Sequence, residues 1–147
     1  MEALHAIFSD PRAMRYWDTL PHAKVAQTRQ FVEAMMGTPF AQGEDFVAEY
    51  AGRAIGKAGF WRLPEIGFIL HPDCWGQGLG SEAVAAVIDH GFKTRGLSEN
   101  TADVDPRNQA SVRLLEKLDF VETGRESKTS KVGSEWCDSV YYRLTNR

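Results

Sequence analysis

A glycine-rich segment near the middle of the chain has the residue types that bind phosphate. The segment HPDCWGQGLGSEA covers residues 71–83, with glycines at positions 76, 78 and 80, and a helical pattern begins directly after them. Glycine allows positive φ and has no Cβ to keep an anion away, and the first turn of a helix offers unpaired N–H groups. These N–H groups could converge on a pyrophosphate, with the Ser81 hydroxyl as a further donor. From these residues alone, a glycine turn without a ligand is the alternative.

Two other phosphate-binding sequences fit this segment poorly. A P-loop needs GxxxxGK[ST], and no lysine follows these glycines. The dinucleotide fingerprint GxGxxG/A, read from Gly76, ends on Ser81 instead of glycine or alanine. An acidic residue does lie about 20 residues on, at Asp103, as that fingerprint requires. However, the residues HPDCW separate the glycines from the preceding strand, which argues against a dinucleotide site.

The hydrophobic pattern predicts which elements position the segment. Apolar residues at helical spacing predict helices over residues 2–8, 22–36, 79–95 and 109–118. Strand-like runs lie at residues 45–51, 53–63, 65–70, 100–105, 120–127 and 135–144. The stretch YAGRAI predicts a tight hairpin at Gly52. The order of two helices, three antiparallel strands, helix, strand, helix and two strands predicts a mixed α/β (α+β) fold, with residues 1–147 as a single domain.

Composition excludes several classes of function. The 147 residues are 43% hydrophobic and 25% charged, with a net charge of −3, which argues against nucleic acid as the main partner. No apolar run approaches the roughly 18 residues of a membrane span, and the N-terminus does not resemble a signal peptide. The two cysteines and four histidines are scattered, so no metal site is predicted. A reduced, cytoplasmic protein is the simplest expectation.

Two linked motifs resemble those of a known enzyme superfamily. EIGFILHPDCWGQGLGSEA followed by ADVDPRNQASVRLLEKLDF is similar to the Gcn5-related N-acetyltransferases (GNAT), most of all to the RimJ/RimL-like branch. The resemblance extends from about Glu2 to Tyr142. It implies an acetyl-CoA-dependent transferase with a twisted, mixed sheet of about six strands and four helices. The family's first strand has no counterpart before the helix at residues 2–8, and an open sheet edge there could pair with a second copy as a homodimer.

The resemblance assigns acetyl-CoA to three parts of the chain. The pyrophosphate would contact Trp75, Gly76, Gln77, Gly78, Leu79, Gly80 and Ser81. The strand segment Phe68, Ile69 and Leu70 would pair its backbone with the pantetheine arm, whose amides need partners when buried, with Phe68 and Leu70 as the favoured partners. Asn108 would hydrogen-bond the same arm, and Ser111 would lie near the sulfur. The alternatives are a plain helix cap for Asn108 and ordinary N-terminal polarity for Ser111.

The implied reaction is direct transfer of an acetyl group to a primary amine, either a protein N-terminus or a small amine. The amine must lose a proton, and Glu65 and Asp103 are the best-placed carboxylates to accept it, directly or through water. The alternative for each is a solvated charge at a strand end. Many members place a tyrosine as acid where this chain has Leu115, so Ser111 or water would assist the leaving thiolate. Asp119 replaces the usual glycine after the last helix, where a left-handed residue is expected.

A non-catalytic, acyl-CoA-binding regulatory or interaction domain is the competing function, because the tyrosine and the first strand are missing. The acceptor cannot be named from the sequence. The loops expected to shape its pocket are residues 9–21, 37–44 and 126–135. The aromatic residues Tyr16, Trp17 and Trp61 are interpreted as core residues, with an acceptor pocket as their alternative.

Overall fold

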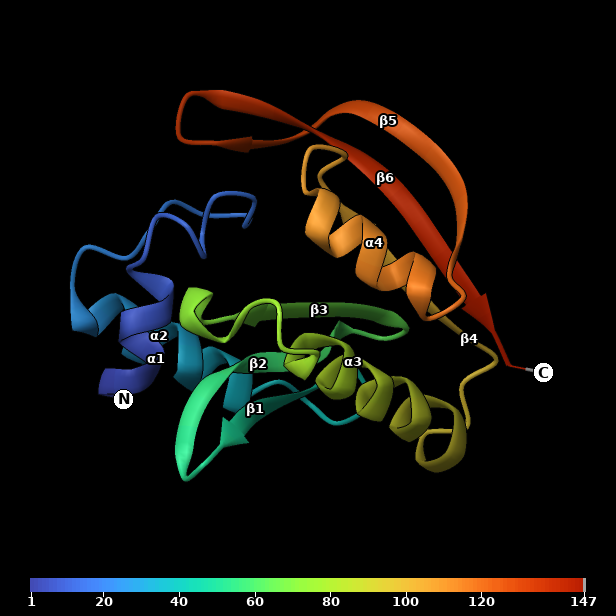
Figure 1. Cartoon of the computed structure of the whole chain (residues 1–147), viewed down its shortest axis with the longest axis horizontal. Helices are drawn as coiled ribbons and strands as arrows, with labels where there is room; N and C mark the ends of the chain where they lie inside the picture. The colour runs from blue at the N-terminus through green and yellow to red at the C-terminus, as the bar shows by residue number, and fades with distance from the viewer. Residues whose placement is uncertain (147) are drawn as a thin grey trace.

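A computed structural model describes residues 1–146 and contains one mixed sheet flanked by helices (Figure 1). The six strands have the order β1-β2-β3-β4-β6-β5. The strands are β1 (Glu44–Tyr50), β2 (Arg53–Arg62), β3 (Glu65–Leu70), β4 (Glu99–Val104), β5 (Val121–Val132) and β6 (Glu135–Thr145). The helices are α1 (Glu2–Phe8), α2 (Val25–Met36), α3 (Leu79–Asp89) and α4 (Gln109–Lys117). A short 3-10 helix (Pro72–Cys74) precedes the glycine segment, and a π-helix (His90–Thr94) continues α3.

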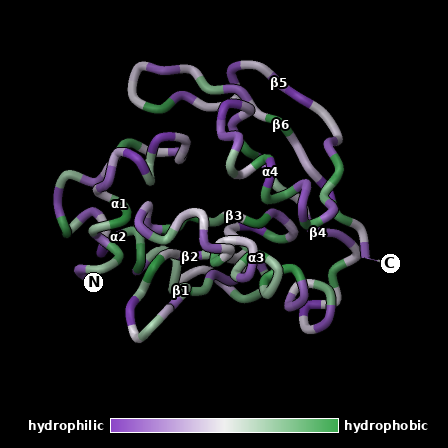
Figure 2. The backbone as a smooth tube through the Cα atoms, in the orientation of Figure 1, coloured by the Kyte–Doolittle hydropathy of each residue, from purple (hydrophilic) through white to green (hydrophobic). Residues whose placement is uncertain are grey.

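Hydrophobic residues form a separate core on each face of the sheet. The larger core joins the sheet to α3 and α4 through Phe60, Val84, Leu115 and other buried residues. The smaller core joins it to α1 and α2 around Phe8 and Ile69. Figure 2 shows the mixture of hydrophobic and hydrophilic residues along these elements. The arrangement confirms the predicted fold, with six strands and four α-helices.

The sheet opens between its two central strands. β3 and β4 are parallel and pair only at Glu65 with Thr101 and at Ile66 with Ala102. Beyond these pairs the strands separate, while β3 stays paired with β2 as far as Leu70. The stretch from Gly67 to Leu70 therefore has one edge free of sheet pairing.

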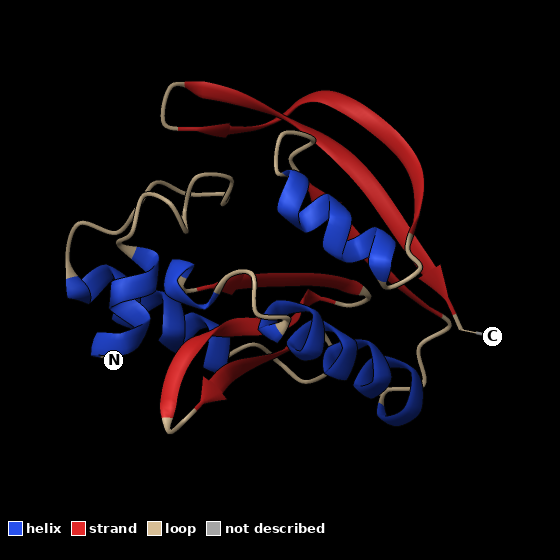
Figure 3. Cartoon of the chain, in the orientation of Figure 1, coloured by secondary structure: helices blue, strands red, loops and turns tan. Residues whose placement is uncertain are grey.

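The C-terminal hairpin differs from the sequence prediction. Residues 126–135 are not a loop, because β5 continues to Val132 and β6 begins at Glu135, which leaves a turn at Gly133 (Figure 3). Most side chains of β5 are exposed, so the strand lacks the apolar alternation by which strands are found in a sequence. The predicted hairpin at Gly52 is confirmed, with φ of +78°. Asp119 has φ of +71°, the left-handed conformation that the sequence predicted after α4.

Leu115 is a core residue. It has no exposed surface and packs among the residues that join α4 to the sheet. We expect Leu115→Ala to lower the free energy of unfolding by about 2–5 kcal/mol, because it removes buried methyl groups and leaves a cavity. Urea unfolding measures this change. Arg113→Ala on the exposed side of the same helix is the control and should change stability by less than about 0.5 kcal/mol; equal losses in both variants would contradict the prediction.

Two histidines share one buried hydroxyl between α1 and α2. Nδ1 of His5 and Nδ1 of His22 each lie 2.8 Å from Oγ1 of Thr28, which is completely buried. Burial, and then the nearby His5, lowers the pKa of His22 below its usual value. The folded protein therefore resists protonation of His22, and the unfolded chain binds more protons below about pH 6.5.

Stability should consequently fall as the pH is lowered from about 6.5 toward the depressed pKa of His22. The free energy of unfolding, measured in urea at pH 7.5 and at pH 5.5, tests this expectation. His22→Gln should flatten the pH dependence, since glutamine does not titrate. If His22→Gln kept the wild-type change of unfolding free energy with pH, groups other than His22 would cause that change.

No helix within residues 1–146 combines the length and the apolar character needed to cross a membrane.

Candidate functional site

The glycine segment forms an open turn at the N-terminus of α3. Gly76 and Gly78 have φ of +73° and +77°, and no atom lies within 4 Å of the position where a Cβ would be at either residue. Gly78 is the N-cap of α3, and no side chain caps the helix there. The start of α3 therefore has no side-chain cap and open space beside its two glycines, as anion binding by its first amides requires. Gly80 is helical, and its Cβ position is 3.3 Å from Leu114 on α4.

Side chains around the turn hold it against β3. The Trp75 indole Nε1 donates to the Leu70 carbonyl at 3.0 Å, and Gln77 Nε2 donates to the Asp73 carbonyl at 3.1 Å. The Leu70 carbonyl therefore already has a partner. The Ile69 carbonyl lies against Gly56 of β2, so Phe68 has the freer backbone on this edge. Gln77 could contribute only its amide N–H to a ligand, because its side chain is used within the turn.

Asn108 and Ser111 lie at the start of α4, across the gap from β3. Oδ1 of Asn108 accepts a hydrogen bond from the Ser111 backbone N–H at 3.2 Å, so Asn108 is the N-cap of the helix. A plain helix cap was the alternative role that the sequence allowed for Asn108. The cap uses only the amide oxygen, and the Asn108 Nδ2 group forms no hydrogen bond within the described residues.

One cavity of about 840 Å³ brings most of the predicted binding residues together. It lies between the edge of β3, the glycine turn and the start of α4. Its lining includes the predicted residues Phe68, Ile69, Leu70, Trp75, Gly76, Gly78, Gly80, Ser81, Asn108 and Ser111. The cationic side chains Arg12, Arg15, Arg113 and Lys117 also line it. An elongated molecule with an anionic part and backbone-like amides fits this combination of positive charge, open turn and free strand edge.

The N-terminal loop forms another wall of this cavity. Tyr16 and Trp17 line it, which is the alternative that the sequence left open for both residues. Trp17 also packs against the smaller core, as expected for a core residue. Trp61 is not a core residue, because 48% of its surface is exposed. These side chains lie in loops or at strand ends, where periodicity does not reveal which way they point.

Glu65 and Asp103 lie close together outside this cavity. Burial raises the pKa of Glu65, and the negative charge of Asp103 raises it further. The indole N–H of Trp61 donates to the Glu65 carboxylate and so acts in the opposite direction. Burial also raises the pKa of Asp103, and the nearby Ser139 hydroxyl opposes this effect. Glu65 is partly buried and Asp103 is more exposed. Carboxylates with raised pKa values are suited to proton transfer. Glu65 is three residues before Phe68 on the same strand, at the end where β3 meets β4.

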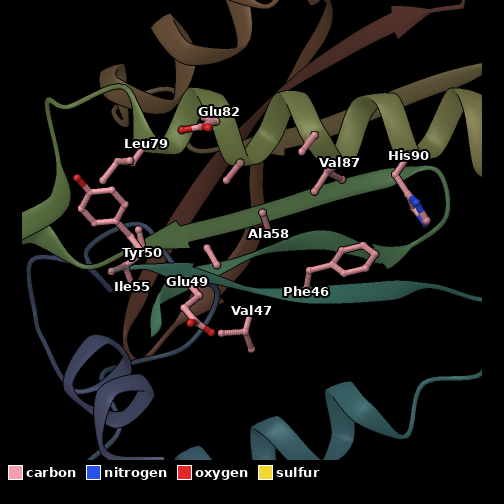
Figure 4. A pocket seen from close by; sticks show the side chains of 13 residues that line it. Phe46, Val47, Glu49, Tyr50, Ile55, Ala58, Leu79, Glu82, Val87 and His90 are labelled. Carbon is pink, nitrogen blue, oxygen red and sulfur yellow. The ribbon is translucent and has the colours of Figure 1, made fainter. Parts of the chain in front are cut away.

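A second cavity, of about 540 Å³, lies between β1 and α3 and is shown in Figure 4. Phe46, Tyr50 and Leu79 lie on its walls, with His90 at one end. Leu79 is the single predicted binding residue in it, so the Leu79 side chain points away from the turn. Nε2 of His90 is 2.7 Å from the Glu44 carboxylate.

The family model for the acetyltransferase (GNAT) domain matches residues 1–121. The chain belongs to the GNAT acetyltransferase family. It is 29% identical to the N-acetyltransferase p20 of Bacillus licheniformis over 156 aligned positions, which cover 99% of this chain and 87% of that protein. The GNAT-family acetyltransferase of Bacillus anthracis has a similar structure, with a TM-score of 0.86 and 29% identity over 98% of this chain and 87% of that one. The chain is therefore an N-acetyltransferase.

A second solved structure bears on the cofactor. The acetyltransferase yncA of Salmonella typhimurium, solved with acetyl-CoA, has a TM-score of 0.75 and 21% identity over 98% of this chain and 87% of that one. At this identity the likeness establishes the fold alone. GNAT acetyltransferases use acetyl-CoA, and the 840 Å³ cavity has the open turn and free edge that such a molecule needs. No group of three or more metal-ligating side chains occurs within residues 1–146.

Sequence reasoning missed two parts of the site. The cationic residues Arg113 and Lys117 are four positions apart on α4 and therefore share one face of this helix. The four-residue spacing of Arg113 and Lys117 could have indicated that both side chains lie on one side of the helix. Arg107 was also missed, and no motif in the sequence distinguishes it from a solvated arginine.

Proposed function

We propose that this GNAT acetyltransferase transfers the acetyl group of acetyl-CoA directly to a primary amine, and that residues 1–147 form one catalytic domain. The open glycine turn at the start of α3, next to the free edge of β3, is the observation that carries this proposal. The amides of the turn from Gln77 to Ser81 bind the pyrophosphate. The edge of β3 and Asn108 bind the pantetheine arm, with Ser111 near its sulfur.

The residues of the chain have few tasks in this reaction. Bound acetyl-CoA supplies the activated acetyl group. A backbone N–H of β3 stabilises the charge that develops on the carbonyl oxygen, and the fixed position of both reactants supplies much of the rate. Glu65 accepts the proton of the amine, directly or through water, and Asp103 raises the pKa of Glu65 and relays the proton. Leu115 has no proton to donate, so Ser111 or water assists the thiolate.

Three kinds of amine are candidate acceptors. Relatives and solved neighbours include an L-amino acid N-acyltransferase of Escherichia coli, a ribosomal-protein-alanine N-acetyltransferase of Brucella melitensis and a spermidine N-acetyltransferase of Vibrio cholerae. The RimJ/RimL-like motifs favour a protein N-terminus, and a small amine is the alternative. A cytoplasmic location fits each of these acceptors. β1 is an edge strand of the sheet, as a homodimer through that edge would require.

Two measurements test the proposal. Calorimetric titration with acetyl-CoA and CoA should give binding of one molecule per chain. Release of CoA should then be followed with free L-amino acids, with an alanine-initiated tetrapeptide and with spermidine. Turnover with any of these supports the enzyme. Binding without turnover favours a non-catalytic acyl-CoA-binding domain, and the absence of binding would reject both functions.

A further inference from the structure

Arg107 joins three segments of the chain that are far apart in sequence. It lies in the turn between β4 and α4, where Nη2 and Nε donate to the Asp105 carboxylate at 2.7 and 3.0 Å. The same Nη2 donates to Glu135, at the β5–β6 turn, at 2.9 Å. Its guanidinium carbon lies 5.5 Å from the centre of the Tyr16 ring in the N-terminal loop. The three segments therefore meet at one side chain.

The N-terminal loop and the β5–β6 turn also contact each other directly. Nη1 of Arg15 lies 3.5 Å from the Glu135 carboxylate, and the Arg15 guanidinium lies 4.8 Å from the centre of the Tyr16 ring. The Leu20 side chain lies 3.3 Å from the position of a Cβ on Gly133. The two partners of the Arg15 pair are each about half exposed, so this contact alone is a weak one.

The anchor of the arrangement is the pair between Arg107 and Asp105. The Asp105 side chain is 6% exposed, and its two oxygens accept a bidentate pair of hydrogen bonds, the stronger geometry for arginine and carboxylate. The Arg107 backbone N–H also donates to Asp105, at 2.9 Å. Since this backbone bond does not need the side chain, the turn that presents Asn108 can persist when the Arg107 side chain is changed.

We propose that Arg107 is a positioning residue that fastens the β5–β6 turn and the N-terminal loop to the start of α4, and so fixes the loop wall of the 840 Å³ cavity, at which the acceptor would meet bound acetyl-CoA. This inference rests on the proposed acetyl transfer. Tyr16 lies both under the Arg107 guanidinium and in the cavity lining, so a loop freed from Arg107 changes the shape of that wall. Arg107 itself acts through Tyr16 and Glu135 and touches neither reactant.

Two variants break the link at different places. Arg107→Met removes the guanidinium, and Glu135→Ala removes the hairpin partner while the buried Asp105 keeps its arginine. The control is Arg125→Met, which breaks the exposed pair of Arg125 with Glu122 on the same hairpin at 3.0 Å. We expect amide hydrogen exchange in residues 9–24 and 132–137 to become about tenfold faster in the first two variants and to stay unchanged in the control. Unchanged exchange in both variants would overturn the proposal.

Kinetics separate positioning from a general loss of structure. With the best acceptor among the L-amino acids, the tetrapeptide and spermidine, the acceptor KM should rise about tenfold in Arg107→Met and Glu135→Ala. The acetyl-CoA KM and the calorimetric Kd for CoA should stay within about twofold. The acceptor KM of Arg107→Lys should lie between those of the wild type and Arg107→Met, because lysine keeps the charge without the bidentate geometry. Equal losses for both substrates would overturn the proposal. If wild-type protein binds no acetyl-CoA, the proposed function fails, and the exchange measurement alone decides whether Arg107 fastens the two segments.

Discussion

Gly78→Ala is expected to raise the Kd for acetyl-CoA by about 10–100-fold, the equivalent of about one hydrogen bond to a charged group. Gly78 has φ of +77° at the N-cap of α3, and the space around its Cβ position is open. A methyl group there would occupy the space in which the pyrophosphate is proposed to lie. It would also favour a backbone that turns the first amides of α3 away from their present direction. Calorimetric titration with acetyl-CoA measures the change.

The chain offers a closely matched control for this substitution. Gly52 has φ of +78°, and nothing lies within 4 Å of its Cβ position, but it is in the β1–β2 hairpin. Gly52→Ala therefore carries a similar backbone cost, about 1–2 kcal/mol for a left-handed residue. Both variants should lose similar thermal stability, and only Gly78→Ala should lose affinity. Wild-type affinity in Gly78→Ala would place the pyrophosphate elsewhere.

Glu65→Gln is expected to lower kcat by about 10²-fold with little change in acetyl-CoA affinity, because it removes the proposed proton acceptor. The glutamine amide keeps an oxygen that can accept the hydrogen bond from Trp61, so the local structure should persist. Steady-state kinetics and calorimetric titration measure the two quantities. Asp103→Asn is the matched comparison. A large loss of kcat in that variant, together with wild-type kcat in Glu65→Gln, would reassign the base to Asp103.

The pH dependence gives a second test of Glu65. Its pKa is raised above the usual value by burial and by Asp103, and the base works only when ionised. The wild-type kcat/KM should therefore rise with pH through this raised pKa, and the rise should disappear in Glu65→Gln. A raised pKa also means that the folded protein disfavours the charged carboxylate, so its charge lowers stability at pH values above the unfolded pKa. Glu65→Gln should thus unfold in urea at no lower concentration than wild type at pH 7.

The local parts of this fold could be read from the sequence. The glycine turn and the cap at Asn108 depend on the conformations that glycine and asparagine favour, and both are present at the expected residues. The left-handed Asp119 was anticipated for the same reason. The helices α1, α3 and α4 follow from apolar spacing, since their stripes are the ones buried against the sheet. These features are set within a few residues, which is why a single sequence reveals them.

The walls of the site depended on contacts between distant segments. β5 has exposed residues along most of its length, so pairing with β6, and not burial, defines it as a strand. The direction of Tyr16 depends on which segments its loop meets, and Trp61 lies where the pairing of β2 with β3 is irregular. Arg107 became distinguishable only when the fold placed Asp105, Glu135 and Tyr16 around it.

The sequence by itself determined that an open glycine turn precedes a helix, through the spacing of Gly76, Gly78 and Gly80 and the helical pattern that follows them. The tertiary structure decided what adjoins that turn. β3 and β4 separate after two residue pairs, which leaves a free edge beside the glycines, and the β5–β6 turn meets the N-terminal loop near the start of α4. The physical reason is that backbone conformation at a turn is a local property, whereas a cavity exists only where strands and loops from the whole chain converge.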